Sequence, residues 1–332
     1  MLQLKAALKK YKYKIIEVLI AVGLVTWLVD SGRLDFAILF STPLSVFHLL
    51  GILILLVGVL LRALRWWWLL RAQNINFSLQ QALQLSWIAN FFSSVLPGLA
   101  GGELIRGYYI AREAPVAKVA SVSTVLLDRV LGLYALLWLG IPPLLALMIL
   151  QNELTSAVIQ MGALISLLII GTSILFLALW IHPTRNLILD LMPKRFYAPL
   201  KATLDAYETH GRDLLACFAL SLLSSIMQGA TFLLASQIID TPLDWRQVFL
   251  VSPLVLIANT LPISPGGVGV AETAASVLFA QFGVETGATI MLIVRLWVLI
   301  VRLPGGLFYI FRSRSSLVAQ PVGKAKPPLR LE

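Results

Sequence analysis

Two stretches decide how this sequence folds: ANFFSSVLPGLAGGELIRG at residues 89–107 and ANTLPISPGGVGVAETAAS at residues 258–276. Each begins with Ala-Asn, continues through a proline to a Gly-Gly pair, and then reaches a glutamate. The first overlaps the apolar run at 79–105 and the second lies within the run at 248–282, and each interrupts its run. The shared order of Asn, Pro, Gly-Gly and Glu indicates an internal repeat with one broken segment in each half.

The broken segments predict helices that reverse direction within the membrane. Proline ends a helix, and glycine permits the chain to reverse. Irregular backbone at membrane depth is tolerated only inside protein or beside a water-filled cavity. The helix that restarts after each glycine pair exposes free N–H groups and a positive dipole end, which suit a phosphate. A purely structural hairpin and a small-residue packing face are the alternatives.

The composition places most of the chain in a bilayer. Of 332 residues, 59% are hydrophobic and 13% are charged, with a mean hydropathy of +0.88. Soluble domains carry about 25% charged residues, so this composition argues against a disordered chain and a water-soluble enzyme. The net charge of +10 fits basic cytoplasmic loops better than nucleic-acid binding. The single Cys217 excludes an intrachain disulfide, and the three scattered histidines offer no metal-ligand spacing.

The apolar runs predict an all-α polytopic membrane protein. We expect about six spans, near residues 15–29, 44–61, 119–148, 157–180, 214–239 and 288–311. The expected organisation is a basic cytoplasmic N-terminus at 1–14, one transmembrane domain at 15–312 and a disordered cytoplasmic tail at 313–332. Within that domain we expect repeat units at 44–148 and 214–311, and an amphipathic cytoplasmic loop at 182–213.

The distribution of positive charge predicts the orientation of the broken segments. Most of the 26 Lys and Arg residues fall in segments that we assign to the cytoplasm: the N-terminus, 62–71, 106–118, 182–213 and the tail. Both flanks of the 79–105 segment are therefore cytoplasmic, whereas both flanks of the 248–282 segment are acidic or poor in basic residues. We expect two oppositely oriented re-entrant broken helices in an inverted repeat, as in many transporters. The alternative is eight full spans.

Charged residues inside the apolar runs are the candidates for function. Asp128, Arg129 and Arg295 lie within spans, and Glu103 and Glu272 lie on the broken segments. Charge in a bilayer is costly, so these side chains should face a polar interior. We expect Glu103 or Asp128 to pair with an arginine of the other half. A structural ion pair at Asp128–Arg129 is the alternative.

The candidate site combines these charges with the polar and small residues of the two broken segments. Arg106, directly after a glycine turn, is a better phosphate partner than Arg112, and we expect Arg302 to reach the cytoplasmic surface. The candidate headgroup-binding residues are Asn90, Pro97, Gly101, Gly102, Glu103, Arg106, Asp128, Arg129, Asn259, Pro265, Gly266, Gly267, Gly269, Glu272 and Arg295. No catalytic or metal-binding residue and no cofactor is expected.

Three motifs resemble the lysylphosphatidylglycerol synthase transmembrane-region family. They are NFFSSVLPGLAGGELIR, LDRVLGL at 127–133 and LPISPGGVGVAE at 261–272, and the resemblance covers about residues 15–312. It implies a polytopic plasma-membrane protein that moves or handles phospholipid headgroups. In this family the aminoacyl-transferring activity resides in a cytosolic domain after the membrane part. This chain ends soon after its last span, so we expect no synthase activity.

The leading functional hypothesis is therefore a flippase-like carrier of phospholipid or lipid-linked headgroups, not an enzyme. An accessory subunit of an envelope-lipid or polysaccharide system is the alternative, and an intramembrane lipid-modifying enzyme has less support. The expected partners are anionic or zwitterionic membrane lipids, with no nucleic acid, and with a homo-oligomer or an envelope-synthesis partner left open. We expect a multi-pass protein of the plasma membrane with both termini in the cytoplasm.

Overall fold

The computed structural model describes most of the chain between residues 22 and 316. The described residues are 22–23, 25–27, 29–30, 45–95, 100–113, 118–150, 155–190, 197, 201, 204–208, 210–264 and 266–316. Every regular element within them is a helix. The predicted first span, the N-terminus at 1–14 and the tail at 313–332 lie wholly or largely outside the described residues.

Long apolar helices form the frame of the described part of the chain. Five stretches within it are long and apolar enough to cross a membrane, and they confirm a polytopic helical membrane protein. Their helices are α3 (Val46–Ala72), α6 (Lys118–Trp138) continuing into α7 (Ile141–Leu150), α8 (Ser156–Trp180), α11 (Gly211–Ile238) and α14 (Gly287–Ser316). The break between α6 and α7 falls at a turn before two prolines, as expected for one kinked span.

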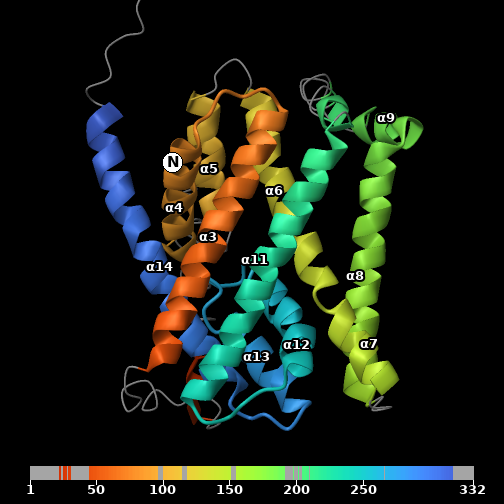
Figure 1. Cartoon of the computed structure of the whole chain (residues 1–332), viewed down its shortest axis with the longest axis vertical. Helices are drawn as coiled ribbons and strands as arrows, with labels where there is room; N and C mark the ends of the chain where they lie inside the picture. The colour runs from red at the N-terminus through yellow and green to blue at the C-terminus, as the bar shows by residue number, and fades with distance from the viewer. Residues whose placement is uncertain are drawn as a thin grey trace, which may run out of the picture.

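Four shorter helices form two antiparallel hairpins that enter the frame from opposite ends. The first hairpin is α4 (Leu79–Val95) and α5 (Ala100–Glu113), and the second is α12 (Trp245–Ala258) and α13 (Val270–Ala280). Figure 1 shows the first hairpin in the upper half of the molecule and the second in the lower half. A helix of 14 residues such as α12 rises only about 21 Å, which is less than the hydrocarbon thickness.

The hairpins confirm the inverted arrangement. In Figure 1, α3 rises, the first hairpin returns to the upper end and α6 descends; α11 then descends, the second hairpin returns to the lower end and α14 rises. The two groups of helices therefore have the same order and opposite orientation. The alternative of eight full spans is wrong, because each broken segment starts and finishes at the same end.

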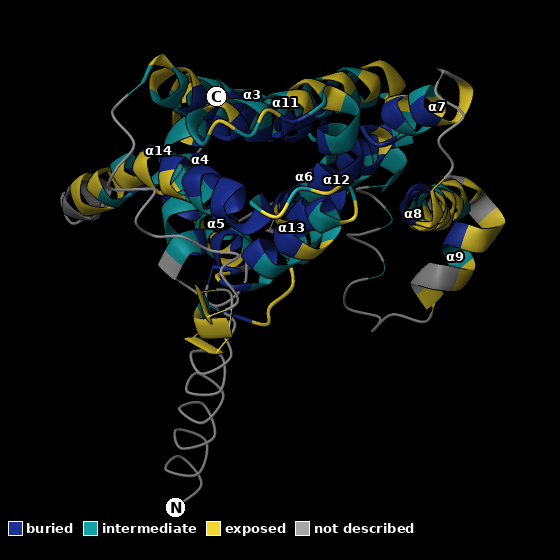
Figure 2. Ribbon diagram, turned by 90° about the horizontal axis from the view of Figure 1, so that it is seen from below, coloured by how far each residue is buried: buried dark blue, intermediate teal, exposed yellow. Residues whose placement is uncertain are grey.

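Burial separates a packed centre from one peripheral helix. Figure 2 shows α4, α5, α12 and α13 within the central group of helices, with mostly buried or intermediate residues, whereas α8 stands apart with much of its surface exposed. Large apolar side chains such as Leu167, Ile174 and Leu177 project from α8 without cover. An apolar surface of this kind suits contact with lipid chains.

A short helix, α9 (His182–Asp190), follows α8 within the predicted amphipathic loop. Its Arg185 is buried and forms ion pairs with Asp205, at 2.9 Å, and with Glu208. These pairs hold residues 205 and 208 against α9.

Glycines allow the first hairpin to pack closely on itself and on α14. A Cβ added at Gly102 would lie 2.0 Å from the Ser93 Oγ, so α5 rests directly on α4. A Cβ added at Gly305 would lie 2.2 Å from the carbonyl oxygen of Trp87. The Trp87 indole N–H also donates to the carbonyl oxygen of Val301 at 2.9 Å. The first hairpin is thus held against the last helix of the other half.

Replacing Gly305 tests this packing. We expect Gly305→Ala to destabilise the protein by about 1–3 kcal/mol, because the added methyl group meets backbone that cannot move aside. The matched control is Gly171→Ala on α8, where an added Cβ meets nothing within 4 Å. Thermal unfolding of both variants in detergent measures the difference. An unchanged melting temperature for Gly305→Ala would contradict the close contact.

Candidate functional site

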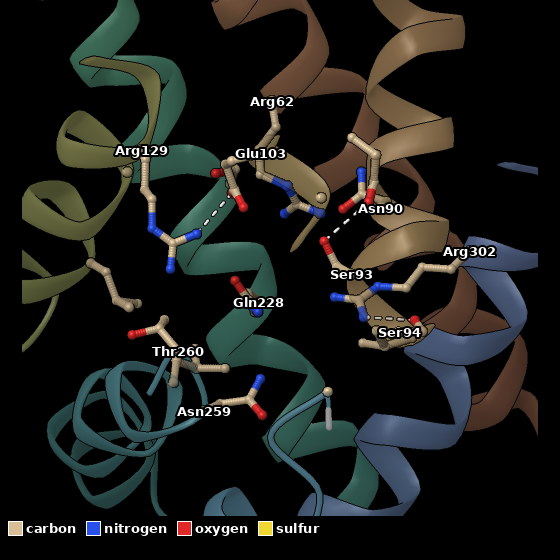
Figure 3. A pocket seen from close by; sticks show the side chains of 18 of the residues that line it. Arg62, Asn90, Ser93, Ser94, Glu103, Arg129, Gln228, Asn259, Thr260 and Arg302 are labelled. Carbon is tan, nitrogen blue, oxygen red and sulfur yellow. Dashed lines mark hydrogen bonds and ion pairs between the residues drawn. The ribbon is translucent and has the colours of Figure 1, made fainter. Parts of the chain in front are cut away.

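A polar cavity lies where the tips of the two hairpins approach each other. It has a volume of about 260 Å³, and its walls come from α3, α4, α5, α6, α11, α12, α14 and the 259–268 turn. Figure 3 shows charged and amide side chains from these elements pointing into it. The charged residues that line it are Arg62, Arg65, Glu103, Arg106, Asp128, Arg129, Arg295 and Arg302.

The tips of the two hairpins touch. A Cβ added at Gly266 would lie 3.4 Å from the carbonyl oxygen of Ser94, which belongs to the end of α4. Gly266 and Gly267 have φ angles of 60° and 73°, in the left-handed region that favours glycine. The predicted glycine reversal is therefore present in the second segment, and it places unwound backbone directly opposite the first hairpin.

Arg295 on α14 holds the unwound tip of the second hairpin. Its guanidinium donates to the carbonyl oxygens of Gly266, at 2.8 Å, and Gly267, at 3.0 Å, and to the Asn259 side chain at 3.3 Å. It also forms an ion pair with Glu272. The Glu272 carboxylate accepts the N–H of Gly269 at 2.8 Å, which caps the start of α13. Arg295 thus donates to the Gly266 carbonyl and adds a second donor to the Gly267 carbonyl, which also accepts the Ala271 N–H at 3.2 Å.

Asp128 on α6 joins three helices of the first half. Its carboxylate accepts from Arg65 on α3 at 2.7 Å and from Arg106 on α5 at 2.8 Å. All three side chains are buried. Arg65 also donates to the Ser221 hydroxyl on α11 at 2.7 Å, and the Arg106 guanidinium lies 4.7 Å from the centre of the Trp66 ring. This triad closes one wall of the cavity.

The remaining ion pair lies at the surface of the cavity. Arg129 on α6 contacts Glu103 on α5 at 2.9 Å, and their side chains are 24% and 29% exposed. Glu103 and Glu272 each lie in the first turn of the second helix of a hairpin, and each pairs with an arginine on the next long helix. Each half therefore contains an equivalent glutamate–arginine pair.

The expected pairing between the halves is wrong. Asp128, Glu103 and Glu272 all pair with arginines of their own half. Asp128 and Arg129 also have different partners, because adjacent residues on a helix point in different directions. Two arginines of the cavity contact the other half, each through a hydroxyl group: Ser221 accepts from Arg65, and the Ser94 hydroxyl accepts from Arg302.

Three arginines of the cavity were missed by the sequence analysis. Arg62 and Arg65 were assigned to a cytoplasmic flank, but α3 continues through both of them to Ala72. Their spacing of three residues, which places them on one helical face, was an available signal. Arg302 was expected at the cytoplasmic surface; instead it lines the cavity and donates to the Ser94 hydroxyl at 2.9 Å. Arg106 likewise turns inward, so these four cations do not belong to the loops.

The predicted site residues fall into three groups. Those that line the cavity are Asn90, Gly102, Glu103, Arg106, Asp128, Arg129, Asn259, Gly266 and Arg295. Gly101, Gly267, Gly269 and Glu272 are in the hairpins but outside that lining. Pro97 and Pro265 lie outside the described residues. Polar residues that were not singled out, among them Ser93, Gln228 and Thr260, also line the cavity.

Comparisons with known proteins agree with the helical architecture. The sequence model of the family described as "Lysylphosphatidylglycerol synthase TM region" matches residues 14–306. The chain is also similar to the UPF0104 membrane protein PH1989 of Pyrococcus horikoshii, with 26% identity over 305 residues, which cover 82% of this chain and 89% of that protein. No solved structure matches the chain.

The buried triad and the partly exposed pair should differ in their contribution to stability. Asp128→Asn leaves Arg65 and Arg106 buried without a counter-charge, so we expect a loss of about 3–5 kcal/mol. Glu103→Gln, at a pair open to the cavity, should cost less than about 1 kcal/mol. Thermal unfolding in detergent measures both variants. Equal losses would show that Asp128 is not the buried counter-ion described above.

Proposed function

Because the chain belongs to the lysylphosphatidylglycerol synthase transmembrane-region family, we propose that it carries the phosphate-bearing headgroup of a membrane lipid from one leaflet to the other. The headgroup enters the cavity between the two hairpin tips, while the acyl chains remain in the bilayer. The protein acts in this proposal as a carrier of lipid and performs no chemical reaction.

The observation that carries this proposal is the arginine-lined cavity at the meeting point of the hairpins. Ionisable residues within apolar helices are costly and generally mark a pathway for substrate or ions. Transporters with inverted repeats bind their substrates at the interface between the repeats, beside broken helices. Here, six arginines converge at such an interface. Guanidinium groups bind phosphate oxygens through charge-assisted hydrogen bonds.

The inverted hairpins suit access from alternate sides. The first hairpin opens toward one end of the molecule and the second toward the other, and their tips meet beside the cavity (Figure 1). A small displacement of either hairpin would open the cavity toward its own end. We propose that the end carrying Arg71, Arg112 and α9 faces the cytoplasm, because positive charge collects on that side of membrane proteins. Both termini would then be cytoplasmic, in the plasma membrane.

A reconstitution experiment tests lipid transfer. We expect the purified protein to accelerate leaflet exchange of labelled phospholipids in liposomes, with a preference among anionic and zwitterionic headgroups. Arg129→Gln removes a cation exposed to the cavity and should slow exchange by about tenfold or more. The matched control is Arg112→Gln at the exposed end of α5, which should exchange lipid at the wild-type rate.

Two measurements make the result decisive. The melting temperature and the size-exclusion profile of each variant must match those of the wild type before exchange is compared. Exchange at the protein-free rate for every lipid, from well-folded wild-type protein, would contradict autonomous transport. That result would instead favour an accessory subunit in envelope-lipid or polysaccharide synthesis.

A further inference from the structure

Two arginines of the cavity have no carboxylate partner within the part of the chain that the structure describes. Arg302 on α14 donates one hydrogen bond to the neutral Ser94 hydroxyl, and Arg62 on α3 forms no ion pair or side-chain hydrogen bond there. Figure 3 shows both guanidinium groups reaching into the same cavity from different helices. They come from opposite halves of the inverted repeat.

The other four arginines are already engaged. Arg65 and Arg106 share the carboxylate of Asp128. The other two pairs are Arg129 with Glu103, and Arg295 with Glu272. Among the described residues, six arginines therefore face three carboxylates, and the cavity holds an excess of positive charge.

This excess of positive charge in the cavity is unfavourable when no anion is bound. A cation withdrawn from water without a partner loses solvation that no other interaction returns. Arg302 also lies within electrostatic range of two like charges, those of Arg62 and Arg295, and of the already paired Glu103. An anion that binds between Arg62 and Arg302 would offset this cost.

We propose that Arg62 and Arg302 together bind a doubly charged phosphate, as in a phosphomonoester, at the headgroup of the transported lipid. This inference rests on the proposed function and names its substrate class. A phosphomonoester carries about −1.5 to −2 charges at neutral pH, against one for a phosphodiester. Each guanidinium presents a planar fork that matches two phosphate oxygens. The Ser94 hydroxyl and the Asn90 side chain lie beside them.

The same arrangement disfavours headgroups that carry an amine. An ammonium group needs a carboxylate or several acceptors when it leaves water. Glu103 and Asp128, the two carboxylates that line the cavity, are both paired with arginines. A zwitterionic or cationic headgroup would find one carboxylate oxygen without a hydrogen-bond partner, Glu103 Oε2, against six guanidinium groups. Binding should therefore favour the headgroup that is purely anionic.

Binding in detergent tests the substrate class separately from transport. The full-length protein is titrated with short-chain phosphatidic acid, phosphatidylglycerol, phosphatidylcholine and inorganic phosphate, and its melting temperature is recorded with each. The variants are Arg62→Gln, Arg302→Gln and the matched control Arg71→Gln, an exposed arginine on the same helix as Arg62. Liposome exchange of the same lipids is measured in parallel.

We expect phosphatidic acid to bind wild type at least about tenfold more tightly than phosphatidylcholine, and to raise the melting temperature. Either Arg62→Gln or Arg302→Gln should remove that preference, whereas Arg71→Gln should retain it. The unliganded Arg62→Gln and Arg302→Gln proteins should melt at or above the wild-type temperature, because each loses an unpaired cation. A purely structural role for these arginines would lower it.

Several results would overturn the proposal. Equal affinities for phosphatidic acid and phosphatidylcholine would exclude a dianion site, and equal affinity for phosphatidylglycerol would exclude the preference for a double charge. Binding of inorganic phosphate without binding of phosphatidic acid would exclude a lipid headgroup as the source. If lipid exchange is unchanged in Arg62→Gln and Arg302→Gln, the phosphate site is rejected but lipid transport is not. If binding depends on these arginines but no exchange is seen, lipid transport is rejected but the phosphate site is not.

Discussion

The hydrogen bonds from Arg295 to the carbonyls of Gly266 and Gly267 are the interaction on which the rest of the structure depends. A helix that stops inside a bilayer leaves backbone groups that must find partners in the protein or in a water-filled cavity. Arg295 donates to two carbonyls of the turn, and Glu272 supplies the balancing charge. With the tip fixed in this way, the second hairpin reaches as far as Ser94 of the first hairpin, and a polar cavity forms between them.

The first half carries a related but different set of charges. It retains the glutamate–arginine pair, as Glu103 and Arg129, but adds Asp128 on the preceding residue of α6. Asp128 joins α3, α5 and α6 through two arginines, whereas Val294 precedes Arg295 in the second half. The two halves are therefore similar in architecture but unequal in charge. The first half contributes four of the six cavity arginines, two of them from α3.

The sequence predicted the reversals better than it predicted the pairing. Glycine and proline at 262–269 specify a reversal through local backbone chemistry, and local chemistry is readable from residue order. The partners of Asp128 depend on which faces of α3 and α5 turn inward, which is a property of packing. Arg62 and Arg65 were misplaced because the uninterrupted apolar run ends at Leu61, while α3 extends for about three further turns through three tryptophans. Hydropathy identifies the part of a helix that faces lipid. It does not identify a part of the helix whose charged residues face a cavity.

The position of Arg62 and Arg65 near one end of α3 has a consequence for biogenesis. When α3 leaves the ribosome, neither hairpin has folded, and positive residues near the end of an apolar helix favour retention of that end in the cytoplasm. The same two side chains later become enclosed as the hairpins assemble. The same pair of residues would then first guide membrane insertion and afterwards line the cavity. Reversing their charge would disturb the orientation of the nascent helix as well as the mature protein.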